Sequence, residues 1–318
     1  SGGATCPSLL LEPSRTNLIN RSEYFGSYTK GGGAGFVVTD NYGTSPEGVQ
    51  NACRIQYTSG NTYLLSNSPN ITTGQVITMS IYAKGTAGEQ FRLYFDGSGG
   101  ATANTEFTLT TDWKRYEVTS SAATANGVVT PHILVGYASS NPATDFQVYG
   151  WQGELASYPS SYIPTYGVSQ TRAVDDAIAT HTIADTETLT YFSEFIAPES
   201  QTGGGEHLLE NSSGSSRIRV YQNTSSTIRI RTDMPSVNFN YSYSSLGISV
   251  GDRVKVCLSV ENGVMTAFIN GVKKNTFGAA TINFAKLHLR PVTEMNVDST
   301  IIFPTALSDV ECIALTTI

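Results

Sequence analysis

Arginine occupies every other position in two short runs of the second half of the chain, Ser216 to Tyr221 and Thr227 to Arg231. Side chains alternate between the faces of a strand, so a hairpin with an odd-numbered loop would place the polar members of both runs on one face. That face would carry Arg217, Arg219, Tyr221, Arg229 and Arg231. Guanidinium groups match carboxylate and sulfate oxygens, which predicts an anionic polysaccharide as ligand. In the alternative interpretation, these arginines pair with nearby Asp and Glu on a solvated face.

A second candidate surface lies in the first half, where apolar and polar residues alternate in the runs Val76 to Ala83 and Phe91 to Phe95. If the apolar members face a core, Tyr82, Arg92 and Tyr94 point outward. Aromatic rings beside hydrogen-bonding groups are typical of sugar sites, so these three residues are candidate ligand contacts. The alternative is a strand face that solvent or an interface covers.

No recognisable catalytic motif is present. The sequence lacks the Glu-x-Asp-x-x-Glu strand of some glycan-cleaving sandwiches, the nucleophile motif G-x-S-x-G and the P-loop pattern. The evenly spaced carboxylates Glu206 and Glu210, and likewise Glu294 and Asp298, are expected to be solvated. The four histidines show no metal-ligand spacing. We therefore predict that the protein is not an enzyme; the less favoured alternative is a polysaccharide depolymerase that assembles Tyr, His and Arg from distant strands.

The composition excludes several classes of partner. The 318 residues carry a net charge of -7 with only 14% charged residues, which argues against nucleic-acid binding through phosphate neutralisation. No apolar run is long enough for a membrane span and no signal peptide is visible, so no membrane insertion is expected. The cysteines lack C-x-x-C spacing, which argues against a zinc site, and free thiols or one disulfide per half both stay open. They are Cys6, Cys53, Cys257 and Cys312.

Short alternating runs separated by turn residues fill both halves of the chain. This pattern predicts an all-β protein of two antiparallel β-sandwiches in tandem. Pro159 and Pro164 interrupt the runs, and the tyrosines around them predict a linker that is packed onto a surface. We place the two domains at residues 1–168 and 169–318.

Several motifs of the first half occur together between residues 9 and 176. They are Leu11-Glu-Pro-Ser-Arg-Thr-Asn-Leu18, Ser22-Glu-Tyr-Phe25, Ser80-Ile-Tyr-Ala-Lys-Gly85, Tyr149-Gly-Trp-Gln-Gly-Glu154 and Ser161-Tyr-Ile-Pro-Thr165 with Thr171-Arg-Ala173. As a set they resemble a module of bacteriophage tail proteins, which is similar to the carbohydrate-binding jelly rolls attached to polysaccharide-degrading enzymes. The resemblance implies a jelly roll in a tail fibre or tailspike. It also implies a structural calcium ion, for which Asn20, Glu23 and Asp145 are available oxygen donors.

The second half carries a resemblance of its own. Its carriers are Arg253-Val-Lys-Val-Cys-Leu-Ser-Val260, Met265-Thr-Ala-Phe-Ile-Asn-Gly-Val272 and the stretch from Phe303 to Thr316. They resemble the concanavalin A-like lectin and laminin-G family of sandwiches. Within the last stretch, Ser308 and Glu311 have the spacing of a capping box that begins one short helix.

Together the two resemblances imply a non-catalytic, glycan-binding adhesin segment of a phage tail. Such a segment belongs to the virion, acts outside the cell and binds host or environmental polysaccharide. The alternative is a structural spacer of the tail without a ligand of its own, which would assemble as a homo-oligomer such as a trimer. Nothing in the sequence identifies the sugar.

Overall fold

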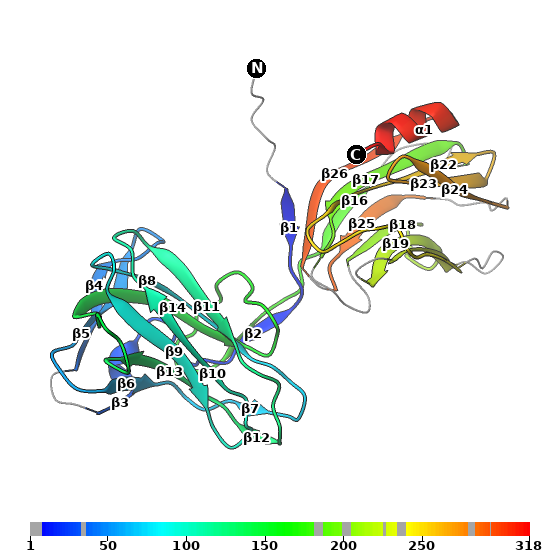
Figure 1. The fold of residues 1–318 in the computed structure, drawn as a ribbon. Coiled ribbons are helices and arrows are strands. Elements are labelled where there is room, and N and C mark those ends of the chain that lie inside the picture. Colours follow the sequence, from blue (N-terminus) through cyan, green and yellow to red (C-terminus); the bar gives the residue numbers. More distant parts are fainter. Residues whose placement is uncertain are drawn as a thin grey trace. The chain divides into compact units, whose positions relative to one another are not determined.

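The computed structural model describes residues 8–32, 36–180, 187–198, 205–224, 227–233, 240–278, 284–292 and 294–318. The chain divides into two compact units, which we call the first and the second sandwich. The first sandwich is Ser14–Arg172, and the second combines Ala173–Ile318 with the described residues of Ser1–Pro13. Each unit is built from antiparallel sheets, which confirms the predicted all-β architecture (Figure 1).

The first sandwich contains two five-stranded sheets. One has the order β10-β9-β13-β6-β3 and consists of β3 (Thr29–Gly32), β6 (Thr62–Leu65), β9 (Gln90–Asp96), β10 (Ala103–Thr108) and β13 (Thr130–Val135). The other has the order β11-β8-β14-β5-β4 and consists of β4 (Val37–Thr44), β5 (Gln50–Gln56), β8 (Thr78–Gly85), β11 (Lys114–Thr119) and β14 (Asp145–Glu154). Two short pairs complete the unit: β2 (Arg15–Asn17) with β15 (Gln170–Arg172), and β7 (Asn70–Ile71) with β12 (Gly127–Val128).

The core of the first sandwich follows from alternation along β9 and from nearly continuous burial along β8, β13 and β14. On β9, Phe91, Leu93 and Phe95 are buried while the residues between them are not. On β14, Trp151 is fully buried, and its ring centroid lies 5.5 Å from that of Phe25 in the short 3-10 helix η1 (Phe25–Ser27). The outward face of the sheet that contains β9 is thereby left for a ligand or for solvent, whereas the segment after β14 contacts β11 and β14 of the other sheet.

The second sandwich contains two six-stranded sheets. The first has the order β1-β26-β17-β22-β23-β24 and consists of β1 (Leu9–Leu11), β17 (Leu189–Ile196), β22 (Arg253–Glu261), β23 (Val264–Ile269), β24 (Val272–Phe277) and β26 (Met295–Phe303). The other has the order β16-β25-β18-β19-β20-β21 and consists of β16 (Ala177–Thr180), β18 (Glu206–Glu210), β19 (Arg217–Thr224), β20 (Thr227–Asp233), β21 (Asn240–Tyr243) and β25 (Lys286–Arg290).

A single α-helix, α1 (Asp309–Thr316), closes the described part of the second sandwich. Ser308 caps it, and the reciprocal bond between the Glu311 side chain and the Ser308 backbone confirms the predicted capping box. The helix lies over the sheet that contains β22, β23 and β24 (Figure 1). In the part of the chain that the structure describes, no helix has the length and apolar character that a membrane span requires.

The division between the units differs from the expected boundary at residue 168 on both sides. Residues 9–13 were expected in the first domain, but β1 pairs with β26 and Leu11 is buried in the second core. The free backbone groups at the edge of β26 provide a partner for this segment, although it is distant in sequence. At the other end, β15 pairs with β2, so the first sandwich extends to Arg172.

The proline-containing segment after β14 packs on the first sandwich largely as predicted. Ile163 is buried, and Tyr158 and Tyr162 are half-buried. Tyr166 was expected to be buried as well, but it is 64% exposed. Its hydroxyl donates to Oε1 of Glu23 at 3.2 Å. The hydroxyl is therefore bound to the protein, while the ring is exposed to solvent.

Candidate functional site

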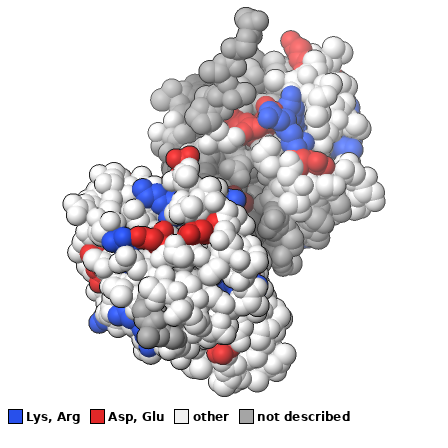
Figure 2. Space-filling view, turned by 60° about the vertical axis from the view of Figure 1, so that its left-hand side comes forward, with Lys and Arg blue, Asp and Glu red and all other residues white. Residues whose placement is uncertain are grey.

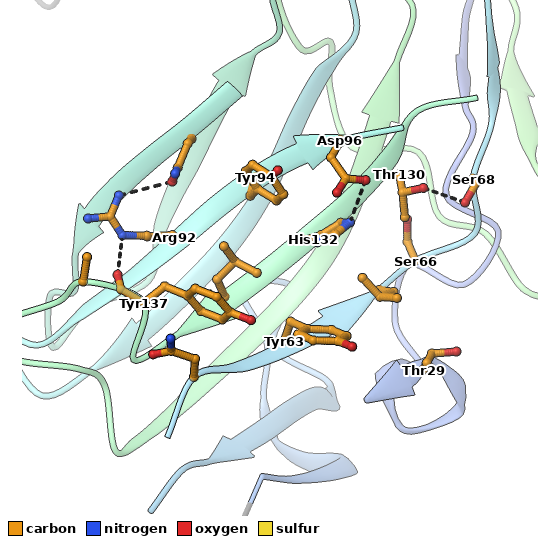
Figure 3. A pocket seen from close by; sticks show the side chains of 15 residues that line it. Thr29, Tyr63, Ser66, Ser68, Arg92, Tyr94, Asp96, Thr130, His132 and Tyr137 are labelled. Atoms are coloured by element: carbon orange, nitrogen blue, oxygen red, sulfur yellow. Dashed lines mark hydrogen bonds and ion pairs between the residues drawn. The ribbon is translucent and has the colours of Figure 1, made fainter. Parts of the chain in front are cut away.

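A groove of about 910 Å³ lies on the outward face of the sheet β10-β9-β13-β6-β3 of the first sandwich. Most of its lining comes from alternate residues of three neighbouring strands, β6, β9 and β13 (Figure 3). The lining side chains used below are Tyr63, Arg92, Tyr94, Asp96, His132 and Tyr137. Amide and hydroxyl groups complete the lining, including Asn61, Ser66, Ser68, Asn104 and Thr130.

The strand register explains why these side chains meet. Tyr94 of β9 lies opposite His132 of β13, and Arg92 lies opposite Leu134. Leu134 in turn lies opposite Tyr63 of β6. Directly opposed residues of an antiparallel pair share a face, so these registers place the two tyrosines and the histidine in adjacent rows.

Three half-buried tyrosines give the groove its apolar surface: Tyr63, Tyr94 and Tyr137. The ring centroid of Tyr94 lies 5.1 Å from that of His132 in an edge-on arrangement, and the ring of Tyr63 is 6.3 Å from it. Figure 3 shows the rings of Tyr63 and Tyr137 turned toward the open space between the strands. Ring faces and hydroxyl tips are therefore both available to a ligand.

Tyr63 occupies its place because the facing residue on β3 is a glycine. Gly31 lies opposite Tyr63, and a Cβ atom at Gly31 would come within 2.2 Å of Cζ of the ring. Any larger residue would push the ring away from this part of the groove. Gly31 thus sets the position of an aromatic side chain that lies on another strand.

The positive charge of Arg92 is neutralised within the groove wall. Its Nη2 donates to Oε2 of Glu106 at 2.9 Å, its Nε donates to the carbonyl oxygen of Tyr137 at 2.8 Å, and its Nη1 donates to Asn104 at 3.2 Å. Arg92 therefore holds β10 and the Tyr137 backbone in place, and few of its donors are left for a ligand.

Asp96 and His132 define the polar end of the groove. The Asp96 side chain is 52% exposed, and its Oδ1 lies 3.7 Å from Nε2 of His132. Among the described residues, this buried nitrogen has no hydrogen-bond partner. Burial lowers the pKa of His132, and the Asp96 carboxylate opposes that shift. A buried ring nitrogen without a hydrogen-bond partner is costly, so this position adds to the burial that favours the neutral imidazole of His132.

The structure places the sequence-predicted residues of the first half in two different sheets. Arg92 and Tyr94 line the groove, whereas Tyr82 lies on β8 in the opposite sheet. There the guanidinium carbon of Arg115 lies 5.6 Å from the centre of the Tyr82 ring, and the Tyr149 ring is 6.3 Å away. Tyr82 therefore packs with its own sheet and takes no part in the groove.

Of the six lining side chains named first, sequence reasoning found Arg92 and Tyr94 and missed the other four. Asp96 could have been found, because it continues the outward series of Arg92 and Tyr94 along β9. Tyr63 and Tyr137 lie in short or irregular segments without a clear alternation. His132 sits in an apolar run whose side chains are mostly buried on both faces, and only the strand register shows which face it uses.

The arginine-rich face of the second sandwich forms as predicted. β19 and β20 pair with Arg219 opposite Arg231 and Tyr221 opposite Arg229, so the polar members share a face. Figure 2 shows blue and red side chains lying side by side on a largely uncharged surface. Asp233 contacts Arg217 at 3.0 Å, Arg219 at 2.6 Å and Arg231 at 2.9 Å.

Two carboxylates that were expected to be solvated complete this ion-pair network. Glu206 and Glu210 lie on β18, where Glu206 pairs with Arg219 at 2.7 Å and the buried Glu210 lies 3.4 Å from Lys286. The expectation failed because β18 places both carboxylates beside the arginine row of β19. Partial burial works to raise the pKa of Asp233, but its arginine partners bring that pKa below its usual value.

Glu294 and Asp298 were also expected to be solvated, and the structure departs from this prediction in part. Asp298 lies on β26, where its side chain is 16% exposed and contacts Arg253 at 3.2 Å. Glu294 is half-buried. Neither side chain is simply solvated: Asp298 pairs with Arg253, and Glu294, just before β26, accepts from the side chain of Asn296 at 3.2 Å.

The three residues predicted to bind calcium have other partners. Both carboxylate oxygens of Asp145 are bound by Arg54, and Oδ1 of Asn20 accepts from the hydroxyl of Tyr28 at 3.1 Å. Glu23 accepts bonds from tyrosine hydroxyls, including that of Tyr162 at 3.0 Å. Among the described residues, no group of three His, Cys, Asp or Glu side chains could hold a metal ion. These side chains would have to give up their present partners to bind calcium, and calcium binding stays an untested prediction.

The structure describes three of the four cysteines. Cys53, Cys257 and Cys312 are free and buried, whereas Cys6 lies outside the described residues, as does His181. A disulfide in the first half therefore stays untested. In the second half the two thiols lie next to each other without a bond between them.

Comparisons with known proteins yield fold likeness alone. No protein-family model and no curated protein matches the sequence. Among solved structures, the CBM40 of Ruminococcus gnavus IT-sialidase bound to α2,3 sialyllactose matches with a TM-score of 0.35 and 12% identity, over 42% of this chain and 83% of that one. Sheep galectin-11 in complex with glycerol matches with a TM-score of 0.31 and 9% identity, over 41% of this chain and 96% of that one. Values this low carry no functional argument.

Proposed function

We propose that this chain is a non-catalytic glycan-binding segment and that the groove of the first sandwich holds a neutral oligosaccharide. The observation that carries the proposal is a groove in which the half-buried rings of Tyr63, Tyr94 and Tyr137 lie beside the half-exposed carboxylate of Asp96. Sugar rings present apolar C–H faces and hydroxyl edges. The tyrosine faces fit the former, and the tyrosine hydroxyls and the Asp96 carboxylate fit the latter.

The charges of the groove favour a neutral ligand over an anionic one. Its lining contains Arg92 and Asp96 as charged side chains besides His132. Arg92 is already bound to Glu106, whereas the Asp96 carboxylate is half-exposed. A uronate or sulfate would therefore meet an uncompensated negative charge without a free cation to offset it.

The proposal is tested by replacing the groove tyrosines. Tyr94→Ala and Tyr63→Ala should each weaken binding of the neutral oligosaccharide that the intact protein prefers on a glycan array by roughly 5- to 30-fold, or about 1–2 kcal/mol. The matched control is Tyr42→Ala, because Tyr42 is exposed on β4 in the opposite sheet. Unchanged affinity in both groove variants, or binding of acidic glycans alone, would exclude the groove as a neutral-glycan site.

A second candidate site is the arginine face of the second sandwich. Three of its four arginines share three carboxylates, Glu206, Glu210 and Asp233. Arg229 bonds through its Nε to the side-chain oxygen of Asn240 at 2.6 Å rather than to a carboxylate. This excess of cations supports an anionic glycan there. Replacing Arg229 and Arg231 with serine should abolish salt-sensitive binding of a polyuronate or sulfated glycan, and unchanged binding would exclude this face.

The depolymerase alternative has one observation in its favour. The groove brings Arg92, Tyr94 and His132 to adjacent positions, which is the residue set expected of a polysaccharide lyase. The bond between Arg92 and Glu106 weighs against it, because a lyase needs a free cation at the uronate carboxylate. Formation of unsaturated uronates from acidic polysaccharides, followed by ultraviolet absorbance, distinguishes this alternative from simple binding.

The biological setting rests on the sequence resemblance. We infer that the chain belongs to a phage tail fibre or tailspike, acts outside the cell on host or environmental polysaccharide, and assembles as a homo-oligomer such as a trimer. A non-binding spacer of the tail is the remaining alternative. Sedimentation of the purified chain tests the oligomer, and a glycan array without any hit would favour the spacer.

A further inference from the structure

Two cysteines of the second sandwich meet under its C-terminal helix. The sulfur atoms of Cys257 and Cys312 lie 3.4 Å apart, and both residues are fully buried. Cys257 comes from β22 and Cys312 from α1, and 55 positions separate them in the chain. With Phe192 and Phe268 they form a small apolar cluster that is distinct from the core between the sheets.

The strand register explains how this contact arises. Cys257 lies opposite Phe192 of β17 and Phe268 of β23, at the centre of the sheet face that α1 covers. Its neighbours Val256 and Leu258 point the other way, into the core between the sheets. The thiol of Cys257 therefore points from the sheet toward the helix, where it contacts the thiol of Cys312.

The helix contacts the sheet through the cysteine cluster, through the half-buried Leu315 and through polar bonds such as that between Lys273 and Asp309. Cys312 and Thr316 are its buried residues, whereas Val310 is 76% exposed. The hydroxyl of Thr316 donates to the Cys312 carbonyl at 2.7 Å within the helix and accepts from the backbone nitrogen of Gly271, in the turn between β23 and β24, at 3.2 Å. A segment with so little buried apolar surface is expected to open locally more readily than the core strands, which gives reagents access to the two thiols.

We propose that Cys257 and Cys312 form a disulfide in an oxidising environment and that this bond fastens α1 to β22. A low-molecular-weight disulfide such as oxidised glutathione is the oxidant. The thiolate of one cysteine attacks it, which forms a mixed disulfide and releases one reduced glutathione. The second cysteine then attacks the protein sulfur, displaces the other glutathione and completes the bond. The two thiols lose two protons and two electrons in total, and two reduced glutathione molecules carry them away.

The bond needs only a short movement. The sulfur atoms of a disulfide lie about 2.05 Å apart, and these two thiols are already in contact. Side-chain rotation or a small shift of α1 closes the remaining gap. The crosslink would span a long loop of the unfolded chain, so it stabilises the second sandwich mainly by restricting its unfolded state.

The test uses the intact chain. The reduced protein is incubated with oxidised glutathione, alkylated and digested without reductant, and its peptides are mapped by mass spectrometry. A peptide that links Cys257 to Cys312, together with a rise on the order of 5–10 °C in the unfolding temperature of the second sandwich, is the expected result. Adding reductant should reverse both changes.

Two variants separate this effect from general thiol oxidation. Cys312→Ser should abolish the linked peptide and the temperature rise, whereas Cys53→Ser, at a buried cysteine of the first sandwich, should leave both unchanged. The peptide map of the unaltered chain tests the proposal even if a variant folds poorly. Persistently free thiols, stable glutathione adducts at either residue, or a crosslink of Cys257 or Cys312 to another cysteine would each overturn the proposal.

Discussion

Nε2 of His132 lies 3.7 Å from Oδ1 of Asp96, beyond normal hydrogen-bond distance, at the polar end of the groove. Burial favours the neutral imidazole, while the carboxylate favours the protonated one. These two opposing effects act on His132, whose buried Nε2 has no hydrogen-bond partner among the described residues. This balance leads to the first prediction.

Asp96→Asn should lower the pKa of His132 further, because it removes the charge that opposes burial. The imidazole resonances of His132 in a proton NMR titration measure this shift. Asp112→Asn is the control, since Asp112 is exposed and outside the groove lining. The Asp96→Asn variant should also weaken neutral-glycan binding by roughly 3- to 30-fold, because a carboxylate acceptor is lost. A His132 pKa that rises in Asp96→Asn would contradict this account of the groove.

Glu106→Gln should make the groove more tolerant of acidic sugars. The change removes the carboxylate that neutralises Arg92 at 2.9 Å and leaves a cation in the groove wall. Affinity for an oligouronate should rise by roughly 3- to 10-fold at low salt, while affinity for the neutral ligand changes little. Calorimetric titration at two salt concentrations measures both. Glu117→Gln, at an exposed position of β11 in the opposite sheet, is the control and should have no effect.

Gly31→Ala should reduce glycan binding without a direct loss of any ligand contact. Its new Cβ would lie 2.2 Å from Cζ of Tyr63, so the tyrosine ring must move. Binding should fall to about the level of Tyr63→Ala, and a double variant should add little further loss. Gly278→Ala serves as control, because a Cβ there meets no atom within 4 Å. Full additivity of the two groove substitutions would show that Gly31 does not act through Tyr63.

The second sandwich should lose stability in mild acid through His207. This residue is 2% exposed, and its Nδ1 lies 3.0 Å from the Tyr191 hydroxyl and 2.9 Å from the Ser193 hydroxyl. Burial lowers its pKa to about 3. In the unfolded chain His207 has a pKa of about 6.5 and binds a proton below that pH. In the folded chain His207 stays neutral over the same pH range. Stability is complete above about pH 6.5 and should fall by at most about 1.4 kcal/mol per pH unit down to about pH 3.

His207→Gln should remove most of this pH dependence, at the cost of some stability at neutral pH from lost hydrogen bonds. Both tryptophans lie in the first sandwich, so their fluorescence follows that unit, and hydrogen exchange of β17 and β22 amides follows the second. His132→Gln is the matched control, because it alters a buried histidine of the first sandwich. If the acid dependence of β17 and β22 survives His207→Gln, another group is responsible.

Local periodicity determined which residues share a face. The alternation along β9 placed Arg92 and Tyr94 outward, and the alternation along β19 and β20 predicted a shared arginine face if the two strands pair, as they do. The Ser308 and Glu311 spacing likewise predicted the start of α1. These features depend on strand pleat, on a short hairpin or on one helical turn, so the chain specifies them without distant partners.

Long-range pairing decided the composition of the groove. β8 and β9 are neighbours in sequence but belong to opposite sheets, so the outward face of Tyr82 and that of Tyr94 are different surfaces. His132 entered the groove through the register of β13 against β9. The carboxylates Glu206 and Glu210 met the arginine row because β18 pairs with β19. Side-chain alternation assigns a residue to one face of its own strand, and only the packing of distant strands decides what that face meets.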